Sequence, residues 1–242
     1  MAGRRVEGLK INLHSELVRI HQKIKAYSSD AANEHHRYRS WEHCYGYFRG
    51  SRPEGIVANR DHAALQLAFY LASWGMYRGS SFLLRHAYTI HRGTIELIVH
   101  PRFAPLWEID FGAKTTDYEF VPTICDLING IKQAYKPFAP ASNSAQPTDT
   151  LVTKVILGTF ACLPACDRYF LDGFKSEGFK FSRLDDEFVA GLLTFCRANL
   201  TVLRKEQATI ENCRGVHYPF MKLVDMYFWQ VGYEQDTKSR KP

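Results

Sequence analysis

The segment 150–170 constrains the fold of this chain most, because an apolar run at helical spacing ends at a proline and is followed by an aspartate. The residues at that spacing are Leu151, Val152, Val155, Ile156 and Phe160. Proline cannot continue a helix without losing a backbone hydrogen bond, so a break is expected near Pro164. Asp167 then stands where a second helix, 167–174, would begin. The segment therefore predicts a buried helix, a break and a further helix with an acidic start.

Asp167 has two interpretations at such a position. A carboxylate at a helix N-terminus accepts hydrogen bonds from free backbone N–H groups and is stabilised by the helix dipole. Asp167 is therefore either an ordinary N-cap or a carboxylate that stabilises a developing positive charge during a reaction. Aspartate is among the commonest N-caps, and the sequence leaves both interpretations open.

Helical periodicity continues along the whole chain and predicts an all-α fold of about eight helices, with no convincing strand. The other expected helices span 13–27, 32–48, 61–77, 94–99, 122–135, 184–207 and 218–232. The Pro-rich segment 137–149 is the clearest loop. It would separate two packed lobes with a cleft between them, and the simpler alternative is a single helical module over 1–242.

The composition indicates a folded globular protein, since 45% of the 242 residues are hydrophobic and 14% are aromatic. No run approaches the ~18 apolar residues of a membrane-spanning helix, so no membrane contact is expected. The basic N-terminus lacks an apolar signal core, which predicts a cytoplasmic protein. The six cysteines form no Cys-x-x-Cys pair, so neither a metal nor another cofactor is expected.

The net charge of +6 favours a polyanionic partner, and arginines are interleaved with aromatic residues in the first third of the chain. This combination suits phosphate contact together with base stacking, and ordinary packing of aromatic residues would produce the same pattern. Arg39 and Arg78 are the candidates for DNA contact. The candidate walls of a pocket for a planar base are Trp41, His43, Tyr45, Trp74 and Tyr77.

The segment 218–229 repeats the aromatic pattern near the end of the sequence. Lys222 and Asp225 lie one helical turn apart within it. That spacing is typical of a surface ion pair, so no functional role is expected of these two residues.

The residues around Asp167 also resemble a known family. Thr153-Lys154, an apolar helix and then Leu163-Pro164-Ala165-x-Asp167-Arg168 are similar to the catalytic half of the helix-hairpin-helix DNA glycosylase superfamily, in particular its divergent bacterial members. In that family a short turn after the DNA-gripping hairpin ends in an aspartate that heads a helix. The resemblance implies that Asp167 is the catalytic carboxylate and that Lys154 and Arg168 contact DNA. The Gly-Val-Gly hairpin of the family is missing, because 146–150 reads Gln-Pro-Thr-Asp-Thr.

The resulting hypothesis is a DNA glycosylase that excises a modified or damaged base, and by analogy with bacterial anti-phage glycosylases the base would belong to viral DNA. This chemistry needs a flipped nucleotide, a pocket for its base, and a carboxylate that stabilises an oxocarbenium-like sugar. Two alternatives remain. A helical ribonuclease toxin of the Arg-x4-6-His type would use Arg37 and His43, and a non-catalytic adaptor would use its aromatic residues as a partner surface.

Overall fold

The computed structural model describes residues 13–139 and 147–240, and every regular element within them is a helix. The α-helices are α1 (Leu13–Asp30), α2 (Arg39–Ala58), α3 (Arg60–Ser73), α4 (Arg92–Ile98), α5 (Val121–Tyr135), α6 (Asp149–Thr159), α7 (Arg168–Ser176), α8 (Asp186–Ala198), α9 (Leu200–Arg214) and α10 (Phe220–Ser239). Five short 3₁₀ helices join them: η1 (Phe82–Arg85), η2 (Tyr88–His91), η3 (Pro101–Trp107), η4 (Thr115–Phe120) and η5 (Lys136–Phe138). The prediction of an all-α fold is confirmed.

The described part of the chain has more helices than the eight or so expected. Helix α2 is broken at Arg52, whose φ of 54° and ψ of 171° are not helical, so these ranges hold eleven α-helical segments. The break precedes Pro53, and proline disfavours the helical region for the residue before it. The expected helix 184–207 is two helices that meet at Asn199. The Asn199 side chain donates a hydrogen bond to the Phe195 carbonyl oxygen at 3.0 Å, which competes with the regular backbone pattern.

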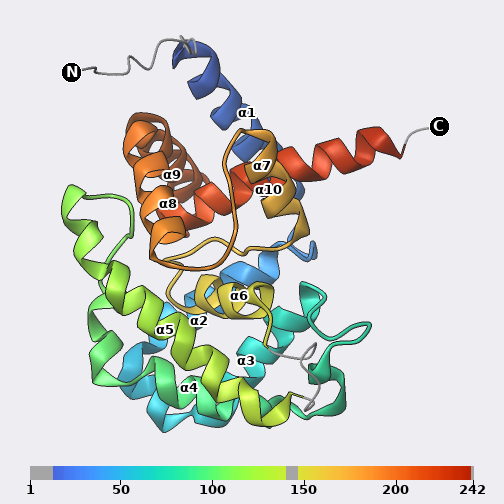
Figure 1. Cartoon of the computed structure of the whole chain (residues 1–242), viewed down its shortest axis with the longest axis vertical. Helices are drawn as coiled ribbons and strands as arrows, with labels where there is room; N and C mark the ends of the chain where they lie inside the picture. The colour runs from blue at the N-terminus through green and yellow to red at the C-terminus, as the bar shows by residue number, and fades with distance from the viewer. Residues whose placement is uncertain (1–12, 140–146, 241–242) are drawn as a thin grey trace, which may run out of the picture.

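Helix α6 lies at the centre of the molecule, between α2–α5 on one side and α1 with α7–α10 on the other (Figure 1). It packs against α2, α3 and α5, whereas α1 packs against α9 and α10. Helix α1 precedes the 137–149 loop and yet packs with helices that follow it; residues 140–146 of this loop lie outside the described residues. One continuous cluster of buried side chains connects the two groups of helices.

Helix α6 is buried on every face, as its composition predicts. Every residue from Leu151 to Thr159 is buried, including Lys154. The hydroxyl of Thr148 caps the helix by accepting a hydrogen bond from the Leu151 backbone N–H at 3.2 Å. A lysine in such a helix needs a partner inside the protein, because an isolated buried charge is costly.

Helices α7 and α10 cross so closely that only glycine fits at the contact. A Cβ atom on Gly173 would lie 1.9 Å from the Phe228 carbonyl oxygen, and one on Gly232 would lie 2.0 Å from that of Tyr169. Both distances are far below van der Waals contact, so a side chain at either position would force the two backbones apart. The crossing brings the first turn of α7, which follows Asp167, against the buried part of α10.

Candidate functional site

Asp167 caps α7 and also pairs with a buried lysine. Its backbone is extended (φ −88°, ψ 176°), and its Oδ1 accepts a hydrogen bond from the Phe170 backbone N–H at 3.1 Å. Its Oδ2 accepts a hydrogen bond from Lys154 Nζ at 2.9 Å. The Lys154 side chain is only 3% exposed and that of Asp167 is 17% exposed. The predicted cap is therefore confirmed, and it belongs to an interior ion pair that the sequence did not indicate.

A second lysine–aspartate pair has the same construction. Lys222 Nζ lies 2.9 Å from Asp225 Oδ2 and 3.2 Å from the Tyr27 hydroxyl. Asp225 Oδ1 accepts a hydrogen bond from the Ala165 backbone N–H at 3.0 Å, so each aspartate receives one ammonium and one backbone N–H. The expectation of a surface ion pair is wrong, because the two side chains are 2% and 5% exposed. Residues Tyr218 to Gly232 are buried on every face of the helix, and this burial carries the pair into the interior.

The segment between α6 and α7, residues 160–167, connects the two ion pairs. All of its residues are buried except Asp167, which is half-buried. The break expected near Pro164 is present, since α6 ends at Thr159. Buried backbone groups need hydrogen-bond partners, and side chains from the neighbouring helices supply them here. The Cys166 backbone N–H donates to Thr153 Oγ1 at 2.9 Å, and the Ala165 N–H donates to Asp225. Helices α6 and α10 thus fix the segment that positions Asp167.

Both ion pairs line one interior cavity of about 10 Å³, which has room for about one water molecule. The other residues in its wall are Tyr70, Trp74, Leu157, Ala165 and Trp229. Of all the residues in the wall, only Trp74 and Asp167 are half-buried, and the others are buried. These two therefore form the outer side of the cavity, which has no room for a group much larger than a water molecule.

Aromatic rings surround the two ammonium groups. Lys222 Nζ lies 4.8 Å from the ring centre of Tyr27, 5.1 Å from that of Trp41 and 5.8 Å from that of Trp74. Lys154 Nζ lies 4.9 Å from the Trp74 ring centre. Such contacts stabilise a cation that has lost its water. Burial nevertheless lowers the pKa of Lys222, because the lost hydration outweighs the attraction of Asp225.

Trp74 connects the cavity with the surface. Its ring stacks on Tyr38 with a centroid distance of 5.4 Å, and the exposed Arg37 places its guanidinium 5.4 Å from the Trp74 ring centre. The indole N–H is buried and has no hydrogen-bond partner among the described residues. Gly75, with a φ of +74°, ends α3 directly after Trp74, which is why the helix stops short of the predicted residue 77.

The other predicted pocket residues lie away from the cavity wall. Trp41 is fully buried behind the wall: it donates a hydrogen bond from Nε1 to the carbonyl oxygen of the wall residue Leu157 at 2.8 Å, and its ring contacts Lys222. Tyr45 stacks on Trp41 with ring centres 4.9 Å apart. His43 faces solvent. The Tyr77 hydroxyl forms a 2.6 Å hydrogen bond with Nε2 of the buried His91.

The residues predicted to contact DNA differ in their accessibility. Lys154 lies inside the protein, so its ammonium cannot reach a phosphate on the surface. Arg39 is half-buried and lies 3.0 Å from Glu42. Arg78 and Arg168 are exposed, and Arg168 forms a 3.2 Å ion pair with Asp236.

Sequence reasoning missed several residues of the cavity: Tyr70, Lys222, Asp225 and Trp229. The available signal was a lysine and an aspartate within a helix that is apolar on every face. Buried ion pairs seldom stabilise a fold more than apolar side chains of similar volume. Ionisable groups gathered in one interior cavity therefore indicate a functional site.

Comparisons with protein-family models, with curated proteins and with solved structures found no match. Among residues 13–139 and 147–240, no group of three or more histidine, cysteine, aspartate or glutamate side chains could hold a metal ion. None of the helices described in these ranges combines the length and apolar character required to cross a bilayer.

Proposed function

We propose that this chain is a DNA glycosylase that excises a modified or damaged base by hydrolysing its N-glycosidic bond. The observation that supports this most is that two lysine–aspartate pairs share one cavity with aromatic walls. Departure of the base leaves an oxocarbenium-like, positively charged sugar, and a water molecule then adds to its anomeric carbon and releases a proton to solvent, which completes the hydrolysis. A fixed carboxylate in a site of low dielectric constant stabilises that charge far better than water does. Asp167, on the outer side of the cavity, is the carboxylate closest to an incoming nucleotide.

The lysines supply the complementary chemistry. A departing base carries negative charge and leaves more readily when a neighbouring acid donates a proton. Lys222 is the proposed donor, since burial lowers its pKa and thus brings its proton affinity nearer to neutral pH. Lys154 holds Asp167 in place through the 2.9 Å hydrogen bond.

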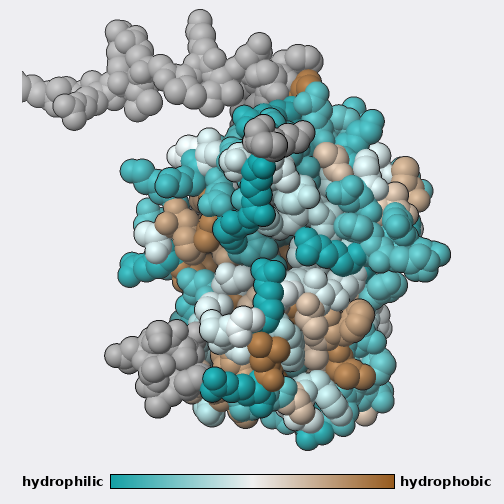
Figure 2. Space-filling view, turned by 90° about the vertical axis from the view of Figure 1, so that its right-hand side faces the viewer, coloured by the Kyte–Doolittle hydropathy of each residue, from teal (hydrophilic) through white to brown (hydrophobic). Residues whose placement is uncertain are grey.

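A nucleotide reaches these groups only when Trp74 moves outward, because the closed cavity holds little more than one water molecule. A flipped base then stacks on an aromatic wall, and the free indole N–H of Trp74 offers a hydrogen bond to its edge. Arg37 lies over the Trp74 ring, and Arg168 directly follows Asp167 at the start of α7. Both arginines are suited to bind the phosphates that flank the flipped nucleotide. The face shown in Figure 2 is hydrophilic over much of its upper part and carries apolar patches at the left and below.

The test is to incubate the purified protein with duplex and single-stranded DNA that carries hydroxymethylated or glucosylated cytosine, with unmodified DNA, and with RNA. Abasic sites, detected as strand breaks after alkaline treatment, are the expected product on modified DNA, because the proposed reaction releases the modified base and leaves the sugar in the strand. Cleavage of RNA would instead support the ribonuclease alternative. Absence of any product would favour the adaptor.

Three matched variants identify the carboxylate. Asp167→Asn should lower the rate of base release by ~10²–10³, the usual cost of losing an electrostatic stabiliser. Asp225→Asn tests the second pair, and Asp126→Asn, which removes an exposed carboxylate paired with Arg102 away from the cavity, is the control. Full activity of a folded Asp167→Asn protein would exclude this residue as the catalytic carboxylate.

A further inference from the structure

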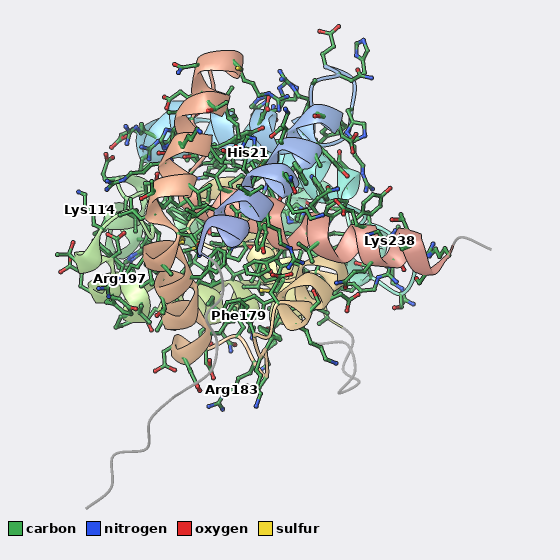
Figure 3. The ribbon with its side chains drawn as sticks, turned by 90° about the horizontal axis from the view of Figure 1, so that it is seen from above. His21, Lys114, Phe179, Arg183, Arg197 and Lys238 are labelled. Atoms are coloured by element: carbon green, nitrogen blue, oxygen red, sulfur yellow. The ribbon has the colours of Figure 1, made fainter. Side chains whose placement is uncertain are left out.

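We propose that a second site, in the groove between α1 and α9, binds a phosphate-bearing small molecule of about the size of a nucleotide. The pocket has a volume of about 610 Å³, which lies in the range of small-molecule sites. Its lining comes from α1, α2 and α9, together with Ala32 in the turn after α1. Figure 3 shows His21 of this pocket on α1 beside α9, far from Lys238 at the end of α10. This proposal does not depend on the glycosylase function.

Positive charge is in excess at one end of the pocket, where Lys25, Arg39 and Arg214 contribute to the lining. Behind them lies Glu42, whose side chain is 4% exposed. It lies 3.0 Å from the Arg39 guanidinium and 3.3 Å from that of Arg214, so two guanidinium groups share one carboxylate. Lys25 is exposed and adds a third cation. An anionic ligand is therefore favoured at this end.

The carboxylate in the lining does not cancel this charge. Glu206 is 4% exposed, and its Oε1 lies 2.7 Å from Nδ1 of His21. The buried Glu206 carboxylate already has the His21 imidazole as a hydrogen-bond partner, so it does not need one of the cations of the pocket as a second partner. Arg214 is already bound by Glu42, by the Ala31 carbonyl oxygen and by the Tyr218 hydroxyl. The groups available to a ligand are therefore the exposed Lys25 and the Nε–H of Arg39.

Polar groups without partners point to the same ligand. The Ser28 hydroxyl and the Arg39 Nε–H are buried, line or adjoin the pocket, and have no hydrogen-bond partner among the described residues. Buried polar atoms of this kind nearly always have a partner in a complete assembly. The hydroxyls of Ser29 and Thr209 also belong to the lining, and each already donates a hydrogen bond to a backbone carbonyl oxygen, those of Lys25 and Lys205. Arginine, lysine and hydroxyl side chains together are the usual partners of phosphate oxygens.

The rest of the pocket has room for an organic group attached to the phosphate. Ile210 and Ala32 supply apolar surface beside the charged end. A free phosphate ion would leave most of the 610 Å³ unfilled, whereas a sugar or nucleoside would cover this surface. The ligand class is therefore a phosphate monoester with a nucleoside-sized organic group.

Isothermal titration calorimetry with inorganic phosphate, deoxycytidine monophosphate and deoxycytidine tests the proposal on the full chain. The monophosphate should bind, and the nucleoside should bind at least about tenfold more weakly, because it lacks the charge-assisted hydrogen bonds. Lys25→Gln should weaken binding of the monophosphate about tenfold. Lys238→Gln, an equally exposed substitution away from the pocket, should leave the affinity unchanged.

Arg39→Lys is the second variant, since it keeps a positive charge beside Glu42 and removes the planar fork. It should also weaken binding, with melting temperature and circular dichroism reporting that the fold is intact. The proposal is overturned if the monophosphate and the nucleoside bind equally or neither binds at millimolar concentration. Equal affinities of the Lys25→Gln and Lys238→Gln proteins would overturn it as well, as would binding of DNA without binding of the mononucleotide.

Discussion

Removal of the Asp167 charge leaves the Lys154 ammonium inside the protein without its counter-ion. Asn keeps the shape of the side chain and caps helices about as well as Asp, so the hydrogen bond to Phe170 N–H should survive. The ion pair with Lys154 should be lost, because the amide carries no charge. Loss of one partner of a buried pair costs roughly 3–5 kcal/mol, and the 17% exposure of Asp167 places the expected value near the lower limit, about 3 kcal/mol.

Lys154→Met should cost a similar amount, since it leaves the carboxylate of Asp167 without the ammonium. The double variant Lys154→Met/Asp167→Asn removes both charges and should regain most of the loss, so it should cost about 1 kcal/mol where additive effects would cost about 6 kcal/mol, which gives a coupling energy of about 5 kcal/mol. The four proteins are compared by urea unfolding at pH 7, followed by far-UV circular dichroism. The free energies of unfolding close a thermodynamic cycle.

An unfolding free energy of Asp167→Asn within ~0.5 kcal/mol of the parent protein would refute the reasoning. Strictly additive losses in the two single variants would do the same. The result also governs the activity test, because Asp167→Asn must be assayed at a temperature at which it is folded. The double variant then separates lost chemistry from lost stability.

Three further predictions concern other parts of the fold. Burial lowers the pKa of His91 from 6.5 to about 4, so the unfolded chain binds the extra proton between these values. The contribution of the neutral His91 side chain to the free energy of unfolding is complete above pH 6.5 and falls by about 3 kcal/mol as the pH drops to 4. His91→Gln should flatten this pH dependence in urea unfolding. Gly173→Ala should lower the unfolding free energy by about 3 kcal/mol or more, whereas Gly191→Ala on α8, which meets nothing within 4 Å, should be neutral or slightly stabilising; equal melting temperatures would contradict the close crossing of α7 and α10. A thiol reagent should label the exposed Cys213 first in the native protein, and rapid labelling of all six cysteines would contradict the burial of most of them.

Local backbone chemistry made part of the site predictable. The break before Asp167 follows from Pro164, and the cap follows from the preference of aspartate for a helix N-terminus. The buried helix at α6 follows from its apolar faces. Each of these features depends on residues that are neighbours in the sequence.

The ion pairs depend on packing between distant segments and could not be predicted in the same way. Lys222 and Asp225 have the spacing of a surface pair, and only the burial of α10 against its neighbours makes them part of a cavity. Lys154 contacts Asp167 because the chain turns back between α6 and α7, in the segment 160–167. The aromatic pattern was equally ambiguous, since Trp74 lines the cavity whereas Trp41 lies in the core with its N–H bonded to Leu157.

The place of α10 in the sequence has a consequence for the nascent protein. Synthesis proceeds from the N-terminus at roughly 5–20 residues per second, and α10 is the last of the described helices to be made. Until it emerges from the ribosome, the Ala165 N–H has no Asp225 to accept its hydrogen bond, and Lys222 is missing from the cavity. A nascent chain from which α10 has not yet emerged therefore lacks the Lys222–Asp225 pair, so any activity of this site begins only after α10 has been translated and has docked against α7.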